Sequence, residues 1–134
     1  MRVAKPKSQI TWFYYRDLEA ASDFYEKILG LERVLDQGWT RVYRTGGSSF
    51  LGLVSGEKGF KQPQKESAVL ISLIVEDVDA WYADLRDKGV PFLRDLGEVA
   101  SIKIRNFFIE DPGGYAVEIQ QFMDPDHARI FAGI

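Results

Sequence analysis

The chain contains no cysteine, and only one of its 134 residues is a histidine, His127. The absence of cysteine excludes disulfide bonds, thiolate metal sites and cysteine nucleophiles. A single histidine excludes histidine-rich metal centres and any Ser–His catalytic pair elsewhere in the chain. Because His127 follows Asp124-Pro125-Asp126 in a polar tail, we expect it to be solvated rather than bound to a metal.

The chain also lacks an excess of charge of one sign and any long hydrophobic run. Its 17 basic and 20 acidic residues give a net charge of −3, which argues against nucleic-acid binding. No apolar run reaches the roughly 18 residues of a membrane span, and the start MRVAKPKSQ lacks the apolar core of a signal peptide. We therefore expect a cytoplasmic protein with no membrane or nucleic-acid partner.

Hydrophobic residues make up 46% of the chain and charged residues 28%, which is typical of a globular protein. A chain of this length buries roughly 68% of its unfolded surface and needs no disulfide or metal to fold. The composition thus favours one domain over residues 1–134.

The first half of the chain predicts a strand, a helix and three further strands. Residues 10–15 (ITWFYY) are almost all β-branched or aromatic, which is typical of a strand buried on both faces. Asp17 occupies the N-cap position of a helix, apolar residues then recur at helical spacing, and Gly30 is placed to end it. The three strands are expected at residues 31–36, 39–45 and 49–54.

The same order of elements begins again after a polar segment, residues 55–67. Asp77 predicts a second N-cap and Gly89 a second helix end. The strands of this half are expected at residues 68–75, 90–95, 101–110 and 115–122. The chain therefore contains an internal repeat, with module 1 at about residues 9–54, a linker over 55–67, module 2 at about 68–122 and a tail over 123–134.

The repeat predicts an α+β fold made of two βαβββ modules. One such module cannot bury both faces of its own sheet, so two modules are needed for a stable core. Together they can form a curved mixed sheet with the helices on its convex side and a central cup on the other. Cups of this kind hold small molecules.

Several short motifs, in this order and spacing, carry a resemblance to a known family. They are Arg16-Asp17-Leu18, Phe24-Tyr25, Leu29-Gly30, Glu76-Asp77-Val78, Gly89-Val90, Arg105, Asp111-Pro112-Gly113-Gly114 and Val117-Glu118-Ile119. Over about residues 9–122 the sequence resembles the vicinal oxygen chelate superfamily, which includes glyoxalases, bleomycin-resistance proteins and ring-cleaving dioxygenases. The resemblance implies paired βαβββ modules, a homodimer and a ligand cup.

In the metalloenzymes of this superfamily, four side chains of the cup bind a divalent cation. Matching the motifs places Ile10, Gly52, Leu70 and Glu118 at these four positions. Only Glu118 can ligate through its side chain, and one carboxylate does not provide the four to six donors that such cations require. We therefore expect no metal and no other cofactor, as in bleomycin-resistance proteins.

Strand alternation assigns side chains to the two faces of the predicted sheet. It places Trp12 and Tyr14 in the cup, together with Ser72, and we extend the cup to the aromatic third strand. The aromatic residues are equally open to a packing role, and Gly52 either allows close backbone approach or leaves room for a ligand. The candidate ligand-binding residues are Trp12, Tyr14, Trp39, Arg41, Tyr43, Gly52, Ser72, Arg105, Phe107, Glu118 and Gln120.

The turn after residue 110 decides which side chains face Glu118. If residue 111 pairs with residue 114, Glu118 faces Phe107, and Arg105 lies diagonally about 7–8 Å away, within reach of the carboxylate. A carboxylate in an apolar cup requires compensation, because burying an unpaired charge is costly. Arg105, a bound proton or a cationic ligand would each supply it.

Three functions are compatible with this reading. The first is a binding protein for a flat apolar or aromatic molecule, either neutral or cationic, with sequestration of an antibiotic or metabolite as the role that the resemblance implies. The alternative is a lyase- or isomerase-type enzyme in which Glu118 is the general acid or base on a carbonyl substrate. The third is a metal enzyme with other ligands, such as Glu118 together with Glu76, Asp77 or tyrosine side chains.

Overall fold

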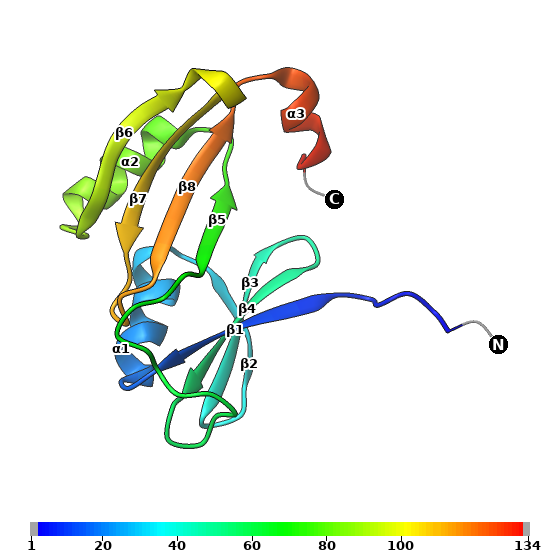
Figure 1. Ribbon diagram of the computed structural model, residues 1–134, viewed down its shortest axis with the longest axis vertical. Helices are drawn as coiled ribbons and strands as arrows, with labels where there is room; N and C mark the ends of the chain where they lie inside the picture. The colour runs from blue at the N-terminus through cyan, green and yellow to red at the C-terminus, as the bar shows by residue number, and fades with distance from the viewer. Residues whose placement is uncertain (1–2, 133–134) are drawn as a thin grey trace. The chain divides into compact units, whose positions relative to one another are not determined.

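The structure, a computed structural model, describes residues 3–132. The chain divides into two compact units, residues 1–63 and 64–134, and each unit is a four-stranded mixed sheet with its own helix (Figure 1). The α+β class and the two βαβββ modules predicted from the repeat are therefore confirmed. Within the described residues, none of the helices is long and apolar enough to span a membrane.

Unit 1 follows the predicted order of elements. Its sheet has the strand order β1-β4-β3-β2, in which β1 and β4 are parallel and the other pairs antiparallel. The helix α1 continues directly into a π-helical turn, η1. The elements are β1 (Gln9–Tyr15), α1 (Leu18–Asp23), η1 (Phe24–Ile28), β2 (Glu32–Asp36), β3 (Thr40–Gly46) and β4 (Ser49–Ser55).

Unit 2 repeats this topology with the strand order β5-β8-β7-β6, in which β5 and β8 are parallel. A 3-10 turn, η2, precedes β7, and a short helix follows the last strand. The elements are β5 (Leu70–Ile74), α2 (Val78–Asp87), β6 (Phe92–Val99), η2 (Ala100–Ile102), β7 (Ile104–Glu110), β8 (Ala116–Phe122) and α3 (Pro125–Ile130).

The helix boundaries depend on the residues that the sequence indicated. Asp17 accepts a hydrogen bond from the Ala20 N–H at 3.1 Å, and Asp77 accepts one from the Ala80 N–H at 3.1 Å. These carboxylates satisfy N–H groups that have no partner inside the helix. Gly30 and Gly89 follow the helices with φ of +73° and +72°, a conformation that glycine adopts without steric cost.

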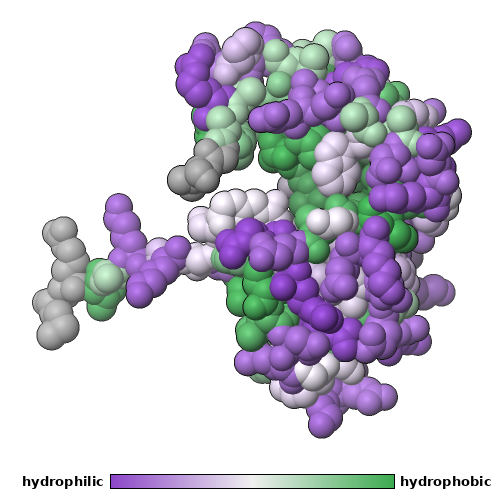
Figure 2. Space-filling model, turned by 180° about the vertical axis from the view of Figure 1, so that it is seen from behind, coloured by the Kyte–Doolittle hydropathy of each residue, from purple (hydrophilic) through white to green (hydrophobic). Residues whose placement is uncertain are grey.

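Each sheet buries one face against its own helix. In unit 1 that face carries Phe13 and Tyr15 of β1, both 1% exposed, and in unit 2 it carries Val117 and Ile119 of β8, both fully buried. The alternate residues of the outer strands remain open, since Ile10 is 41% and Leu70 46% exposed. Hydrophilic side chains cover much of the surface seen in Figure 2, with hydrophobic residues visible in smaller areas between them.

Candidate functional site

The sheet of unit 1 is hollowed on the face that the helix does not cover. The hollow has a volume of about 640 Å³, which suits a drug-sized molecule. Six of its eight lining residues are apolar, and two polar residues, one just before β1 and one at its start, complete its wall. The lining residues are Ser8, Gln9, Ile10, Trp12, Val34, Leu35, Val42 and Phe50.

Trp12 lies flat on the floor of this hollow, because Gly52 on the neighbouring strand leaves it space. The two residues are register partners, and a Cβ added at Gly52 would lie 2.2, 2.4 and 2.7 Å from three bonded atoms of the six-membered ring of Trp12. Distances this similar place that Cβ above the ring face rather than beyond its edge. The space above Gly52 is thus filled by a side chain, the Trp12 ring, which is neither of the two roles expected for this glycine.

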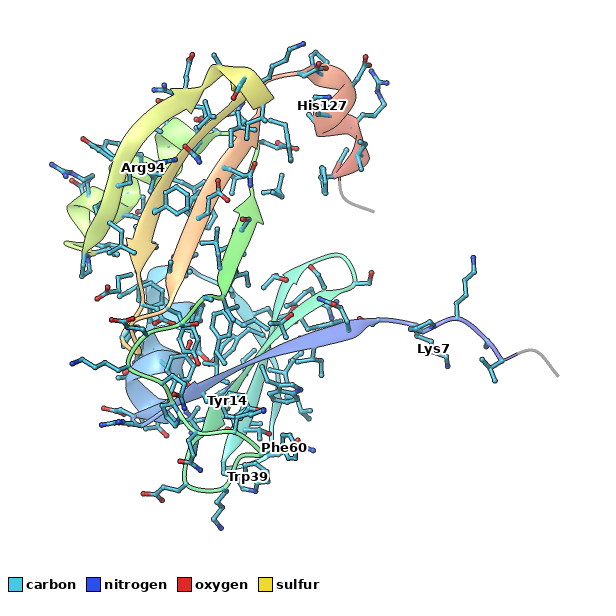
Figure 3. All side chains as sticks on the ribbon, in the orientation of Figure 1. Lys7, Tyr14, Trp39, Phe60, Arg94 and His127 are labelled. Atoms are coloured by element: carbon cyan, nitrogen blue, oxygen red, sulfur yellow. The ribbon has the colours of Figure 1, made fainter. Side chains whose placement is uncertain are left out.

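Tyr14 shares the face of Trp12 but does not line the hollow. The loop after β4 covers it, since a Cβ at Gly59 would lie 2.9 Å from the Tyr14 ring and 2.7 Å from Val54. Figure 3 shows Tyr14 at the end of the unit 1 sheet that also carries Trp39 and Phe60. The loop therefore closes one end of this sheet face.

The side chains of Arg41 and Tyr43 in β3 lie on the opposite face of the sheet from the one predicted from the sequence. Arg41 extends to helix α1, where its guanidinium donates to Glu19 at 2.5 Å and to Ser22 at 2.9 Å. The Tyr43 hydroxyl donates to Glu26 of η1 at 3.1 Å, and Tyr43 is fully buried. The placement of Arg41 and Tyr43 in the cup is thus wrong, because the pairing of Val42 with Gly52 puts Val42 on the face of the hollow.

Trp39 also does not line the hollow. It precedes β3, and 43% of its surface is exposed. Its backbone carbonyl accepts a hydrogen bond from the Ser55 N–H at 2.9 Å, which anchors the turn between β2 and β3 to the end of β4. The aromatic residues of the third strand therefore belong to the helix side or to the rim of the sheet.

A buried polar network occupies the corresponding face of unit 2. Glu118 is 6% exposed and accepts three hydrogen bonds, from the Ser72 hydroxyl at 2.5 Å, the Asn106 amide at 2.7 Å and the Gln120 amide at 3.1 Å. Ser72 and Gln120 thus contact Glu118 on one face, as strand alternation predicts. The carboxylate has about four acceptor positions, so these donors satisfy most of them.

The network and its surroundings include three residues that were not predicted from the sequence, Arg94, Asn106 and Phe108. Arg94 of β6 donates to the Asn106 Oδ1 at 3.1 Å, and its guanidinium lies over the Phe108 ring at 4.4 Å from the centroid. Asn106 therefore links Arg94 to Glu118 through the two ends of one amide. The sequence would have indicated Asn106 and Phe108 if residue 111 had been paired with residue 115 instead of residue 114, because that pairing places both side chains on the face of Glu118.

The β7–β8 register differs by one residue from the sequence prediction. Asp111 pairs with Tyr115, and its carboxylate accepts hydrogen bonds from the N–H groups of Gly113 and Tyr115, both at 2.9 Å. Gly114 has φ of +86°, the left-handed conformation of a three-residue hairpin loop. The extra loop residue moves every side chain of β7 to the opposite face from the one expected.

The expected contact between Arg105 and Glu118 is therefore absent from the described part of the chain. Glu118 faces Phe108, and Arg105 faces Gln121. Arg105 instead binds Asp79 of α2 through two hydrogen bonds of 2.7 and 3.2 Å. Phe107 is fully buried between Tyr82 and Phe92 on the helix side. The placement of Arg105 and Phe107 in the cup is wrong, because the β7–β8 register differs by one residue from the predicted one.

The comparison with family models identifies the fold. Residues 8–119 match the model of the Glyoxalase/Bleomycin resistance protein/Dioxygenase superfamily. The chain belongs to this superfamily. Among curated proteins, the uncharacterized protein YraH of Bacillus subtilis (strain 168) is 27% identical over 124 residues, covering 85% of this chain and 87% of that protein.

Solved structures of the superfamily share the fold at low sequence identity. A glyoxalase/bleomycin resistance protein/dioxygenase from Nocardioides superposes with a TM-score of 0.74 at 18% identity, covering 92% of this chain and 88% of its own. A lactoylglutathione lyase from Agrobacterium tumefaciens superposes with a TM-score of 0.70 at 22% identity, covering 88% of this chain and 96% of the lyase chain. At these identities the likeness shows the fold alone.

The superfamily's divalent cation does not fit the side chains of this chain. Ile10, Gly52 and Leu70 occupy three of the four positions that the resemblance assigns to ligands, and none has a donor atom in its side chain. Glu118, at the fourth, already accepts three hydrogen bonds. Within residues 3–132 no group of three or more histidine, aspartate or glutamate side chains is placed to hold a metal ion.

Proposed function

We propose that this superfamily member binds a planar apolar or aromatic small molecule in the hollow of unit 1. The observation that carries the proposal is the Trp12 indole, which lies flat on Gly52 and lines an apolar hollow of about 640 Å³. A flat indole offers a stacking surface worth about 0.5–1.5 kcal/mol beyond the area that it buries. Ile10, Val42 and Phe50 supply the apolar walls.

A neutral ligand suits this hollow better than a cation. None of the eight residues that line the hollow is acidic, so the lining offers no carboxylate to neutralise a cation. Glu118, the counter-charge considered in the sequence analysis, is engaged by three donors. The role of Glu118 as a general acid or base stays a prediction. In that role a proton from the substrate would compete with these three donors for the carboxylate.

Isothermal titration calorimetry with acridine, a planar and largely neutral probe at pH 8, tests the proposal. We expect binding to the native chain and a loss of about tenfold or more in Trp12→Leu, which corresponds to 1.4 kcal/mol. Trp39→Leu is the matched control, because Trp39 is in the same unit but does not line the hollow. Equal acridine affinity in the native chain and in Trp12→Leu, or no binding to either, would refute the proposal.

The proposal retains the homodimer implied by the resemblance, with no nucleic-acid or membrane partner. Size-exclusion chromatography with light scattering tests the dimer directly. A particle of about 15 kDa, the mass of one chain, would contradict it.

A further inference from the structure

Arg94 is held in a fixed position on the open face of the unit 2 sheet. Its guanidinium carbon lies 4.4 Å from the centroid of the Phe108 ring, and one of its nitrogens donates to the Asn106 Oδ1 at 3.1 Å. In Figure 3 the residue lies on the side of the sheet opposite to α2. Stacking on one ring and bonding to one amide together restrict the rotation of a long side chain that remains exposed.

The Arg94 guanidinium has no carboxylate partner among residues 3–132. Other arginines of the two sheets are paired, since Arg41 binds Glu19, Arg44 binds Glu32 and Arg105 binds Asp79. A guanidinium has five N–H donors, and the hydrogen bond to Asn106 uses one of them. Arg94 is exposed, so the donors that Asn106 does not use are available to a ligand.

The polar network next to Arg94 keeps the carboxylate of Glu118 from pairing directly with the Arg94 guanidinium. Asn106, 3% exposed, stands between Arg94 and Glu118, which is 6% exposed. The Asn106 amide donates to Glu118 and accepts from Arg94, so the two charged groups are separated by one side chain. A buried network of this kind fixes its members, because leaving any of them unsatisfied is costly.

We propose that Arg94 anchors the carboxylate of a small organic acid on the unit 2 sheet. A carboxylate matches the planar fork of a guanidinium with two parallel N–H···O bonds, and such charge-assisted bonds are about twice as strong as neutral ones. Arg94 is not among the residues that line the hollow of unit 1, and the proposal does not depend on the function proposed for that hollow. The Arg94 site selects a ligand that carries a planar, negatively charged group, whereas the hollow of unit 1 selects a ligand with an apolar surface.

Benzoate and its neutral isostere benzamide test this proposal as a matched pair of probes. NMR titration of the 15N-labelled native chain, up to about 10 mM of each probe, should show benzoate binding about tenfold more tightly than benzamide. In Arg94→Gln this preference should disappear. Arg86→Gln is the control, because Arg86 also lies over aromatic rings, at 5.7 Å from Tyr82 and 5.5 Å from Phe92, but on helix α2.

Three results would overturn the proposal: no benzoate binding to the native chain, equal affinity for benzoate and benzamide, or a benzoate preference that survives in Arg94→Gln. If Arg94→Gln does not fold, Arg94→Lys replaces it, and an undiminished preference in that variant counts against the bidentate anchor. Acridine titration of the same proteins separates this proposal from the previous one. Arg94→Gln should retain acridine binding, and Trp12→Leu should retain the preference for benzoate.

Discussion

The six-membered ring of Trp12 occupies the space into which a side chain at position 52 would project. A Cβ at Gly52 would lie 2.2 Å from Cε3 of Trp12, well below the 3.0 Å under which non-bonded contacts of real Cβ atoms are essentially never found. The flat orientation of the indole therefore depends on the absence of a side chain on the adjacent strand. Both the stability of the sheet and the floor of the hollow follow from this pair.

Gly52→Ala should displace Trp12 and weaken acridine binding. Overpacking a filled site costs about 1–3 kcal/mol, so the midpoint of urea unfolding should fall and acridine affinity should drop together. Gly97→Ala is the matched control, because Gly97 is also in a strand and a Cβ there meets nothing within 4 Å. A Gly52→Ala variant as stable as Gly97→Ala, with unchanged acridine affinity, would contradict the role of the glycine.

Asn106→Ala should be markedly more destabilising than Ser72→Ala, although each removes one hydrogen bond to Glu118. Asn106 is 3% exposed, so water does not readily replace its amide, and the buried carboxylate loses a donor at a cost of about 1–3 kcal/mol. Ser72 is exposed on the edge strand β5, where water can take the place of its hydroxyl. Urea unfolding of the two variants measures the difference, and equal losses would contradict the ranking.

Local patterns in the sequence predict the order of the elements and the ends of the two main helices, although β6 continues to Val99 and residues 100–102 form the 3-10 turn η2 instead of the start of a strand. The caps at Asp17 and Asp77 form within one turn of helix, and the glycines that end the helices act through their own φ. Burial of alternate residues in β1 and β8 follows from strand geometry and a hydrophobic pattern. These features depend on neighbouring residues, so the sequence contains the information needed to predict them.

The wrong placements have two causes, which are contacts with a distant helical segment for Arg41 and Tyr43 of β3 and a turn conformation for the residues of β7. Arg41 looked like a ligand-binding residue because its partner Glu19 lies 22 positions earlier and on a helix. The β7–β8 register depends on whether Gly114 adopts a positive φ, which adds one residue to the hairpin loop. Because the side chains of a strand alternate, this single torsion decides whether Arg105 or Asn106 approaches Glu118.

Arg41→Gln should lower stability without changing acridine affinity, because Arg41 faces α1 rather than the hollow. The hydrogen bond from Arg41 and its charge hold the pKa of Glu19 below its ordinary value. That contribution is present above the ordinary carboxyl pKa and is lost as the pH falls through the lowered folded-state pKa. NMR titration should show the pKa of Glu19 rising in Arg41→Gln, and a change in acridine affinity would contradict the assigned face.

Arg105→Gln distinguishes the observed β7–β8 register from the one predicted from the sequence. In the observed register the hydrogen bonds and charge of Arg105 lower the pKa of Asp79, so the substitution should raise that pKa toward its ordinary value. The stabilisation from this pair exists above the ordinary pKa of aspartate and disappears as the pH falls through the lowered one. Both groups lie at the surface, so the effect on unfolding should be small.

The side-chain amide signals of Asn106 and Gln120 report on Glu118, since both amides donate to its carboxylate. They should not move in Arg105→Gln, because Arg105 lies on the opposite face of β7. If these signals shift while the pKa of Asp79 stays where it is, Arg105 contacts Glu118, and the hairpin has the register with residue 111 opposite residue 114. In that register Asn106 would leave the face of Glu118, and the link to Arg94 that underlies the proposed carboxylate site would be lost with it.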